Sequence, residues 1–521
     1  MNSWHRASPP FPIKAQIMEW NSDHPQKPNA SFDGADLDCG NGLLILIRKH
    51  LGPLEPDQVL EILSTDATVE DDLPAWARLT GNNIISKTKN NSQRSYHVRK
   101  GKRTLSANAS VNTERPMVRT ISEVQPHLPR NAELPAFTVT GIGSWPRPRW
   151  MLKAIHERLE NRISDEELQT TANDAVRLVL QAQDRAGVDL VSDGEQRRDS
   201  YASFVGSRLA NCQLIPISDL LPYVDDPEKF AEELKALDVQ GSEIHHPAVL
   251  GPISRSKPLV LHELQYLQSI THKPCKVALP GPYLLTRTLW LECLSEKIYQ
   301  TREELASAVI KILREEIQDL ITSGATIIQL DEPVLTEVVF GKPAKQRSFM
   351  CGALGEKLKA THEELDFASE LLARTLEGFP KERLALHICR GNWSKDESVA
   401  LAGDYRPLMP LLEKVPVGIL FLELCTPRAG EMEVLANLPE SYRLGLGMVN
   451  PKSSLIESVE EIVQKATKAA NLFGPRRILL NPDCGFATFA DSPLAPSEIA
   501  EAKMYSLVQA ARILRQNFKL I

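Results

Sequence analysis

Leu384-Ala385-Leu386-His387-Ile388-Cys389 is the segment of this chain that most clearly indicates its fold. It is a short apolar run that ends in two side chains able to bind a metal. Runs of this length without polar alternation are typical of parallel strands that are buried on both faces. Seven other runs share the pattern, so that eight strands are predicted, over residues 137–141, 190–192, 276–279, 326–330, 384–387, 418–423, 444–447 and 477–480.

Segments with the apolar spacing of amphipathic helices lie between these runs. The clearest of them cover residues 165–186, 302–322, 361–376, 456–472 and 496–514. Eight alternating β/α units predict an α/β protein with a (β/α)8 TIM-like barrel. In such a barrel the active site lies at the carboxyl ends of the strands, so the residues that follow each run become the functional candidates.

The residues at these strand ends are strongly polar. They are Ser144, Asp193, Glu195, the Pro280-Gly281-Pro282 turn, Asp331, Glu332, His387, Cys389, Glu423, Asn450, Asp483 and Cys484. Metal-ligand side chains on one part of the barrel mouth, with carboxylates opposite, predict a metal site beside a site for a cationic group of a substrate. The plain alternatives are a turn or helix-capping role for Ser144, and ion pairs with nearby arginines for the acids.

Four of these side chains form a ligand set for zinc. His387, Cys389, Glu423 and Cys484 offer one imidazole, two thiolates and one carboxylate. Structural zinc sites close with four Cys or His ligands, whereas an oxygen ligand is more easily replaced by water or a substrate. The set therefore predicts a catalytic zinc. The alternative is a buried strand histidine beside core thiols.

Composition sets limits on the class of protein. A chain of 521 residues with 42% hydrophobic content predicts two or more domains with sizeable cores. The net charge of −7 argues against a nucleic-acid partner. No apolar stretch is long enough for a membrane span and the first residues do not resemble a signal peptide, so we expect no membrane association and a cytoplasmic location. Eight cysteines in such a chain favour metal or thiol chemistry over a disulfide framework.

The barrel accounts for residues 134–521 only. Residues 1–30 are predicted to be a disordered lead-in and residues 101–133 a polar linker. Between them, residues 31–100 show the pattern of a small α/β domain, with helices expected over Leu43–His50 and Asp71–Thr80 and a strand over Val59–Ser64.

This small domain resembles the TusA-like sulfur-carrier family. The resemblance lies in Leu37-Asp38-Cys39-Gly40-Asn41-Gly42, in Val59-Leu60-Glu61-Ile62-Leu63-Ser64-Thr65-Asp66, and in Glu70-Asp71-Asp72-Leu73-Pro74-Ala75-Trp76 followed by Thr80-Gly81. It implies that Cys39 is a possible sulfur carrier with a sulfur-relay partner. The family motif Cys-Pro-x-Pro is Cys-Gly-Asn-Gly here, so the alternative is a docking or regulatory module.

The barrel resembles the catalytic domain of cobalamin-independent methionine synthase, in its short core form. The family binds zinc through a His-x-Cys pair, a Glu and a later Cys, which match His387, Cys389, Glu423 in Phe421-Leu422-Glu423, and Cys484 in Asn481-Pro482-Asp483-Cys484-Gly485. The loop Thr140-Gly141-Ile142-Gly143-Ser144 resembles the one that holds the homocysteine carboxylate, which assigns substrate binding to Ile142 and Ser144. Glu195 and Asp331 match the carboxylates that receive the amino group. The resemblance implies methyl transfer to homocysteine.

Zinc chemistry suits this reaction. A free thiol with a pKa near 8.5 is mostly protonated at neutral pH, and coordination to zinc deprotonates it and fixes its line of attack. The glutamate is the natural ligand to loosen, because oxygen is the harder donor at a sulfur-rich zinc.

The sequence departs from the family on the side of the methyl donor. The additional N-terminal barrel is expected to be absent, and the histidine expected after the seventh strand is Asn450. The tryptophan expected to stack on the pterin is not evident directly after the third strand, where Tyr283 or Trp290 is the alternative. Lys452 is the remaining candidate acid. These departures favour a methylated corrinoid, free or on a carrier protein, with 5-methyltetrahydrofolate second. The alternatives are alkyl transfer to another small thiol such as coenzyme M, and a non-catalytic sulfur-relay or thiol-binding protein.

Overall fold

The computed structural model describes most of the chain in two compact units. The described residues are 20–35, 43–79, 82–90, 93–101, 134–159, 162–200, 202–216, 245–290, 298–341, 360–392, 397, 400–490 and 493–520. The units are residues Met1–Pro116 and Met117–Ile521, and each is described by itself. The expected sulfur carrier Cys39 and almost all of the expected linker lie outside the described residues.

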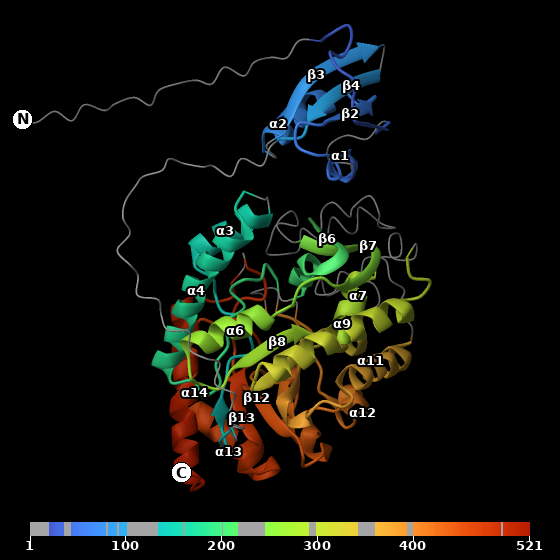
Figure 1. Cartoon of the computed structure of the whole chain (residues 1–521). Helices are drawn as coiled ribbons and strands as arrows, with labels where there is room; N and C mark the ends of the chain where they lie inside the picture. Colours follow the sequence, from blue (N-terminus) through green and yellow to red (C-terminus); the bar gives the residue numbers. More distant parts are fainter. Residues whose placement is uncertain are drawn as a thin grey trace, which may run out of the picture. The chain divides into compact units, whose positions relative to one another are not determined.

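The larger unit is built on a parallel sheet of seven strands (Figure 1). In spatial order the strands are β5 (Thr138–Val139), β13 (Ile478–Pro482), β12 (Arg443–Val449), β11 (Ile419–Leu422), β10 (Leu384–Ile388), β9 (Ile327–Asp331) and β8 (Lys276–Pro280). The strand expected over residues 190–192 is present only as two parallel bridges, Thr140 with Leu190 and Val191 with Cys275. These bridges join residues next to the two edge strands of the sheet.

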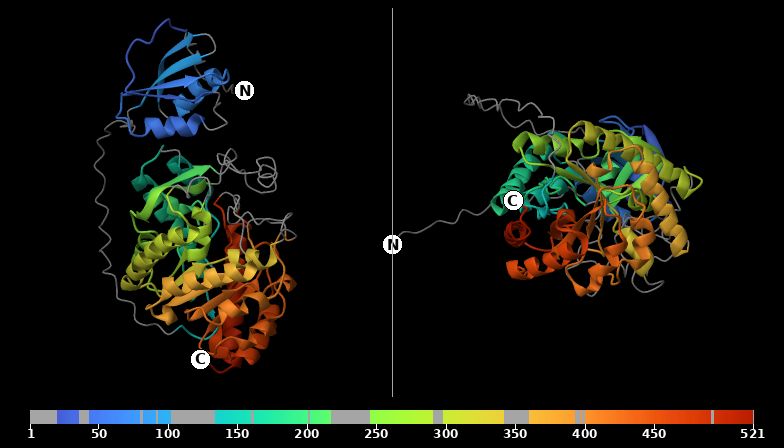
Figure 2. Two further views of the ribbon diagram at one scale, coloured as in Figure 1. Left: turned by 90° about the vertical axis from the view of Figure 1, so that its right-hand side faces the viewer. Right: turned by 90° about the horizontal axis from the view of Figure 1, so that it is seen from below.

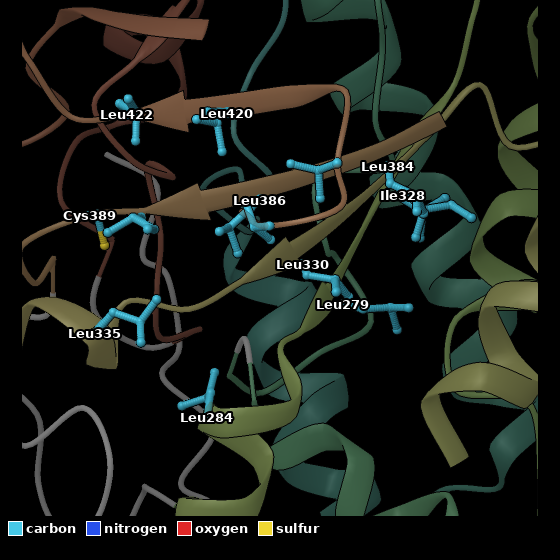
Figure 3. Packing of buried hydrophobic residues seen from close by; sticks show 14 of the residues in the cluster. Leu279, Leu284, Ile328, Leu330, Leu335, Leu384, Leu386, Cys389, Leu420 and Leu422 are labelled. Carbon is cyan, nitrogen blue, oxygen red and sulfur yellow. The ribbon is translucent and has the colours of Figure 1, made fainter. Parts of the chain in front are cut away.

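Both faces of the strands are buried. Leu384, Leu386 and Leu420 pack into the main core, and Figure 3 shows neighbouring leucines of this layer. Ala385 and Ile419, on the alternate face, join a second cluster with Leu479, Ile327, Phe421, Leu190 and Ile142. Because successive side chains of a strand point to opposite faces, burial on both sides explains why the strands appear in the sequence as unbroken apolar runs.

Helices lie outside the strands in the view from below (Figure 2). The long ones are α4 (Asp165–Ala186), α9 (Arg302–Thr322), α11 (Thr361–Leu376), α13 (Val459–Phe473) and α14 (Ser497–Asn517), and the shorter ones are α3 (Arg149–Leu159), α6 (Leu261–Ile270), α7 (Pro282–Leu289), α10 (Val334–Phe340) and α12 (Met409–Leu412). Ser164 and Ser458 cap α4 and α13 in capping boxes, which satisfy amide groups that a helix start leaves unpaired. The described helices include none long and apolar enough to cross a membrane.

One part of the larger unit was not expected. Strands β6 (Leu209–Pro216) and β7 (His245–Arg255) form a separate antiparallel pair after the short 3-10 helix at Ser203–Ser207. The strands are interrupted by Pro and Gly, so the sequence lacks the alternation that predicts a hairpin.

The smaller unit is a four-stranded sheet with two helices on one face. Its elements are β1 (Ala30–Asp33), α1 (Leu44–Leu51), β2 (Val59–Ser64), α2 (Val69–Leu79), β3 (Asn83–Asn90) and β4 (Gln93–Arg99). The strand order is β1-β2-β4-β3, with β1 parallel to β2 and the other pairs antiparallel. Residues 20–29, placed in the expected lead-in, contact this sheet, since Asn21 bridges Thr88 and the Asn29 amide donates to Val59.

Candidate functional site

Three of the four expected zinc ligands converge at the carboxyl ends of the strands. His387 lies in β10, Cys389 directly follows it (Figure 3), and Cys484 follows β13. One ligand atom from each lies within 4.8 Å of the other two. The parallel register brings these ends to the same edge of the sheet, so side chains about 100 residues apart in sequence become neighbours.

His387 is oriented for binding through one nitrogen. Its Nδ1 lies 2.9 Å from Oδ1 of Asp331 on the neighbouring strand. Its Nε2 is buried and has no hydrogen-bond partner among the described residues. Burial acts to lower the pKa of His387, but the hydrogen bond to Asp331 and the negative charge of Cys389 outweigh it, so the pKa is raised. A histidine fixed in this way by a carboxylate is typical of metal sites.

The two cysteines face each other. The Cys484 thiol donates to Cys389, which lowers the pKa of Cys389 and raises that of Cys484. Cys389 is 2% exposed. Two thiols held together in a buried place, beside a histidine nitrogen without a partner, form a donor set for a soft or borderline metal.

Glu423 adjoins this group but is turned toward other partners. Its Oε2 accepts from the Arg390 amide at 2.7 Å, and its Oε1 pairs with the Arg428 guanidinium. The side chain is 2% exposed, and these partners satisfy both oxygens of the buried carboxyl group. Glu423 therefore lies near the cysteines, but the structure does not include it in the group formed by His387, Cys389 and Cys484.

A single pocket opens beside the ligand group. It is lined by Ile142, Ser144, Glu195, Asp331, Pro333, His387, Cys389, Asn392, Cys484, Gly485 and Thr488. The lining includes every residue that the sequence analysis assigned to substrate binding, together with three of the metal ligands. Glu423 and Lys452 are not among its lining residues.

Glu195 is one of two carboxylates on the pocket wall. Burial raises the pKa of Glu195 to about 7, although the charges of Arg198 and Arg147 oppose the shift. Arg198 is only 3.8 Å from Glu195 and is bound mainly to Glu263, at 2.6 Å. Glu195 also has a positive φ of 54°, a conformation that side chains other than glycine rarely adopt and that is common at functional sites.

Asp331 is the other pocket carboxylate, and its neighbour Glu332 has a different role. Both hydrogen bonds of Asp331, from Gln329 at 2.7 Å and from His387, reach Oδ1. Glu332, which the sequence groups with Asp331 beside a site for a cationic group, does not line the pocket. Glu332 accepts from the amides of Tyr283 and Leu284, at 2.8 and 2.9 Å, and so caps α7.

Ser144 is held against the loop that carries Cys484. Its Oγ accepts from the Ala487 amide at 3.3 Å, and its carbonyl accepts from the Phe486 amide at 3.0 Å. A Cβ on Gly485 would lie 2.1 Å from this Oγ, so the contact requires glycine. The loop with Ser144 and the loop with Cys484 are thus joined at the pocket.

Lys452 lies on the side of Glu423, away from the pocket lining. Burial and the charge of Arg428 lower its pKa, while the carboxylates of Glu397 and Glu423 act to raise it. Asn450 donates through its side chain to Glu397 at 2.5 Å. Lys452 is therefore near enough to Glu423 and Cys484 to interact with their charges, but it does not line the pocket.

Several polar residues around the site were not predicted from sequence. The Lys276 ammonium is buried, donates to the Ile142 carbonyl at 2.6 Å and contacts Gln329, which in turn donates to Asp331. Burial lowers the pKa of Lys276 to about 7. Because Lys276 and Gln329 are polar residues inside apolar strand runs, their positions in the sequence could have identified them as site candidates. Asn392, which donates to the Gly485 carbonyl at 2.6 Å, gave no such signal.

The comparisons with known proteins agree with this geometry. The chain matches the model of the cobalamin-independent synthase catalytic domain over residues 137–512, and it therefore belongs to that family. A methionine synthase from Sulfurisphaera tokodaii is 27% identical over 390 residues, which are 74% of this chain and 95% of that protein. One from Saccharolobus solfataricus is 26% identical over 390 residues, which are 74% and 98%.

A solved structure gives a similar result. The B12-independent methionine synthase from Shewanella sp. W3-18-1, in complex with selenomethionine, is 25% identical and has a TM-score of 0.56. The match covers 74% of this chain and 100% of that one.

Proposed function

We propose that this protein is a methyltransferase that transfers a methyl group to the thiol of homocysteine and so forms methionine. The observation that carries the proposal is the single pocket in which His387, Cys389 and Cys484 meet Glu195 and Asp331. The side of the pocket with the metal ligands suits the thiol of an amino-acid substrate, and the side with the two carboxylates suits its ammonium group. Membership of the cobalamin-independent synthase family and the methionine synthases among the relatives support the same reaction.

The residues fit a zinc ion. His387 presents a buried Nε2 without a partner, and the paired thiols of Cys389 and Cys484 become the thiolates that zinc prefers. Glu423 would supply the fourth ligand by turning from Arg428. When bound, zinc would favour the thiolate form of the acceptor sulfur and hold it in place.

The pocket wall would orient the acceptor. Asp331, and Glu195 in its anionic form, would pair with the ammonium group, because the described residues place no lysine or arginine side chain within hydrogen-bond distance of either carboxylate. Ser144 and the backbone near Ile142 would hold the carboxylate. Such positioning turns an encounter between two molecules into a reaction at fixed geometry. The selenomethionine held by the Shewanella relative supports a pocket for this kind of amino acid.

The residues that would act on the methyl donor match the family less closely than those that would bind the acceptor. Lys452 is the proposed acid for a departing folate nitrogen, and its lowered pKa favours that role. The proposed donors are a methylated corrinoid and 5-methyltetrahydrofolate. The relatives' names give no support to a methyl-corrinoid partner or a sulfur-relay partner. The family's description as cobalamin-independent favours 5-methyltetrahydrofolate over a methylated corrinoid, which reverses the order that the sequence favoured.

We also propose that the parallel sheet closes into an eight-stranded barrel. The bridges at Leu190 and Val191 join the two ends of the seven-stranded sheet, and Leu190 shares an interior cluster with residues of β9, β10, β11 and β13. The domain limits 31–100 and 134–521, the TusA-like nature of the smaller unit, sulfur carriage by Cys39 and a cytoplasmic location stay part of this proposal.

Turnover with defined thiols tests the function. Zinc-loaded full-length protein is incubated with methylcobalamin or methyltetrahydrofolate and with either homocysteine or 4-mercaptobutyrate, which is homocysteine without its amino group. Methionine formation, with homocysteine preferred at least tenfold over the analogue, is expected. Equal use of both thiols would favour the coenzyme M type of reaction. Binding of homocysteine without turnover with any donor would favour a thiol-binding protein.

A further inference from the structure

A second group of metal-ligand side chains lies in the smaller unit, outside the site described above. It consists of His24, Glu61 and His97, whose ligand atoms all lie within 4.8 Å of one another. Glu61 is on β2 and His97 is on β4, while His24 belongs to residues 20–29, which precede the first strand. This group rests on its own observations and does not depend on the proposed function.

Residues 20–29 run across the sheet from one edge to the other. Asn21 bridges Thr88 on the edge strand β3, and Asn29 bonds to Val59 on β2, next to the opposite edge. Between these points His24 contacts Ser95 on β4 at 2.8 Å and Thr88 at 3.1 Å. The segment therefore covers the central strands.

The group lies on the face of the sheet opposite the helices. Leu60, Ile62, Tyr96 and Val98 pack with residues of α1 and α2 in one cluster. Glu61 and His97 alternate with these residues along their strands and so point to the other side, where residues 20–29 lie.

His97 is the least satisfied member of the group. It is 1% exposed, and both of its ring nitrogens lack a hydrogen-bond partner among the described residues. Its Nε2 lies 3.9 Å from Oε1 of Glu61, and its ring stacks on that of His24 with a centroid distance of 3.5 Å. A buried imidazole without partners is costly to leave in this state, and a bound cation would satisfy it.

We propose that His24, Glu61 and His97 bind a divalent transition metal of the zinc type. Two imidazoles and one carboxylate are ligands that zinc accepts, and three protein ligands leave one position for water.

The surrounding hydroxyl groups support this assignment. Ser95 donates to Oε1 of Glu61 at 2.8 Å, and Ser86 bonds to Nδ1 of His24. Partners of this kind orient metal ligands. Ligands of a tetrahedral zinc with bonds of about 2.0–2.1 Å lie roughly 3.3 Å apart, so Glu61 and His97 need to approach by less than about 1 Å, with a tilt of the stacked rings. The metal would fasten residues 20–29 to the sheet.

Metal stoichiometry tests the proposal on the full-length chain, with any affinity tag removed. Metal-free protein is loaded with Zn²⁺, desalted, and analysed by inductively coupled plasma mass spectrometry. Wild type is expected to hold about two Zn²⁺ per chain. The variant with both Cys389→Ser and Cys484→Ser should hold about one, which is lost when His24→Asn or Glu61→Gln is added.

The matched control is His50→Asn, which removes a histidine of the same unit that stacks on Phe32 away from the group. It should leave the stoichiometry unchanged. Glu61→Gln keeps the size of the side chain and an oxygen for Ser95, so loss of metal in this variant with an unchanged circular dichroism spectrum reports on the ligand. In the double-cysteine variant Co²⁺ should give visible d–d bands without a thiolate charge-transfer band in the near ultraviolet.

Two results would overturn the proposal. One is a double-cysteine variant that retains no Zn²⁺ or Co²⁺ at micromolar free metal. The other is retention of the remaining metal in both His24→Asn and Glu61→Gln at the level of the His50→Asn control. Failure of homocysteine methylation would affect neither result, so the two proposals fail separately.

Discussion

Asp331→Asn separates substrate binding from metal binding at the barrel site. Asp331 is 7% exposed, and its Oδ1 accepts both Gln329 and His387. Asparagine retains one oxygen for these two bonds, removes the charge and replaces the second oxygen by an NH2 group, which cannot accept from an ammonium. We therefore expect the fold and the orientation of His387 to be kept, while the contact with the substrate ammonium is weakened.

The size of the effect follows from the burial of the carboxylate. Loss of one charged partner in a desolvated pair costs about 2–5 kcal/mol, which corresponds to roughly 30-fold to a few thousand-fold in kcat/KM. Glu195 remains on the same wall and carries part of the pairing, so a loss near the lower end, about 30- to 100-fold, is expected. Changing a partner of a metal-bound histidine also weakens metal binding by about 10- to 100-fold, so the assay needs saturating zinc.

The measurement compares two acceptors. Values of kcat/KM are determined for homocysteine and for 4-mercaptobutyrate, with zinc content recorded for each preparation. The variant should lose activity with homocysteine and change little with the analogue. Asp174→Asn, which alters an exposed carboxylate on α4, is the control. An equal loss with both thiols at unchanged zinc content would refute the contact between Asp331 and the ammonium group.

Three further predictions concern the same site. Cys389→Ser or Cys484→Ser should each abolish retention of the barrel zinc and activity, and full zinc occupancy with turnover in either variant would show the ligand assignment to be wrong. Burial raises the pKa of Glu195 to about 7, so this carboxyl gains its charge as the pH rises from about 6 to 8. The KM for homocysteine should fall over that range, and Glu195→Gln should lose this part of the pH dependence; an identical profile in the variant would contradict the role of Glu195. Triglutamyl methylfolate should give no advantage over the monoglutamate, because the unit that precedes the proposed barrel is a small four-stranded sheet and not the second barrel expected to hold a glutamate tail; faster turnover with the triglutamate would reverse this expectation.

Local sequence patterns were sufficient for much of the secondary structure. Helices α4, α9 and α11 begin and end at the expected residues, because each is long, periodic and bounded by capping or turn residues. Helix α13 begins three residues later than expected, since Ser458 caps it. The strand near Leu190 was overestimated, and the β6–β7 pair was missed because its strands lack a regular alternation.

Hydrophobic period and residue chemistry are local properties, so they were sufficient to predict the α/β class, the order of the main strands and helices, and the types of side chain at the strand ends. Which of those side chains meet depends on the three-dimensional packing. It turned Glu423 toward Arg428, assigned Glu332 to the start of α7, joined Lys276 through Gln329 to Asp331, and brought His24 against His97. These contacts join residues from 2 to 73 positions apart. Such contacts depend on how the packed strands and loops arrange charged groups and hydrogen-bond donors in space. That arrangement cannot be inferred directly from the spacing of the residues along the chain.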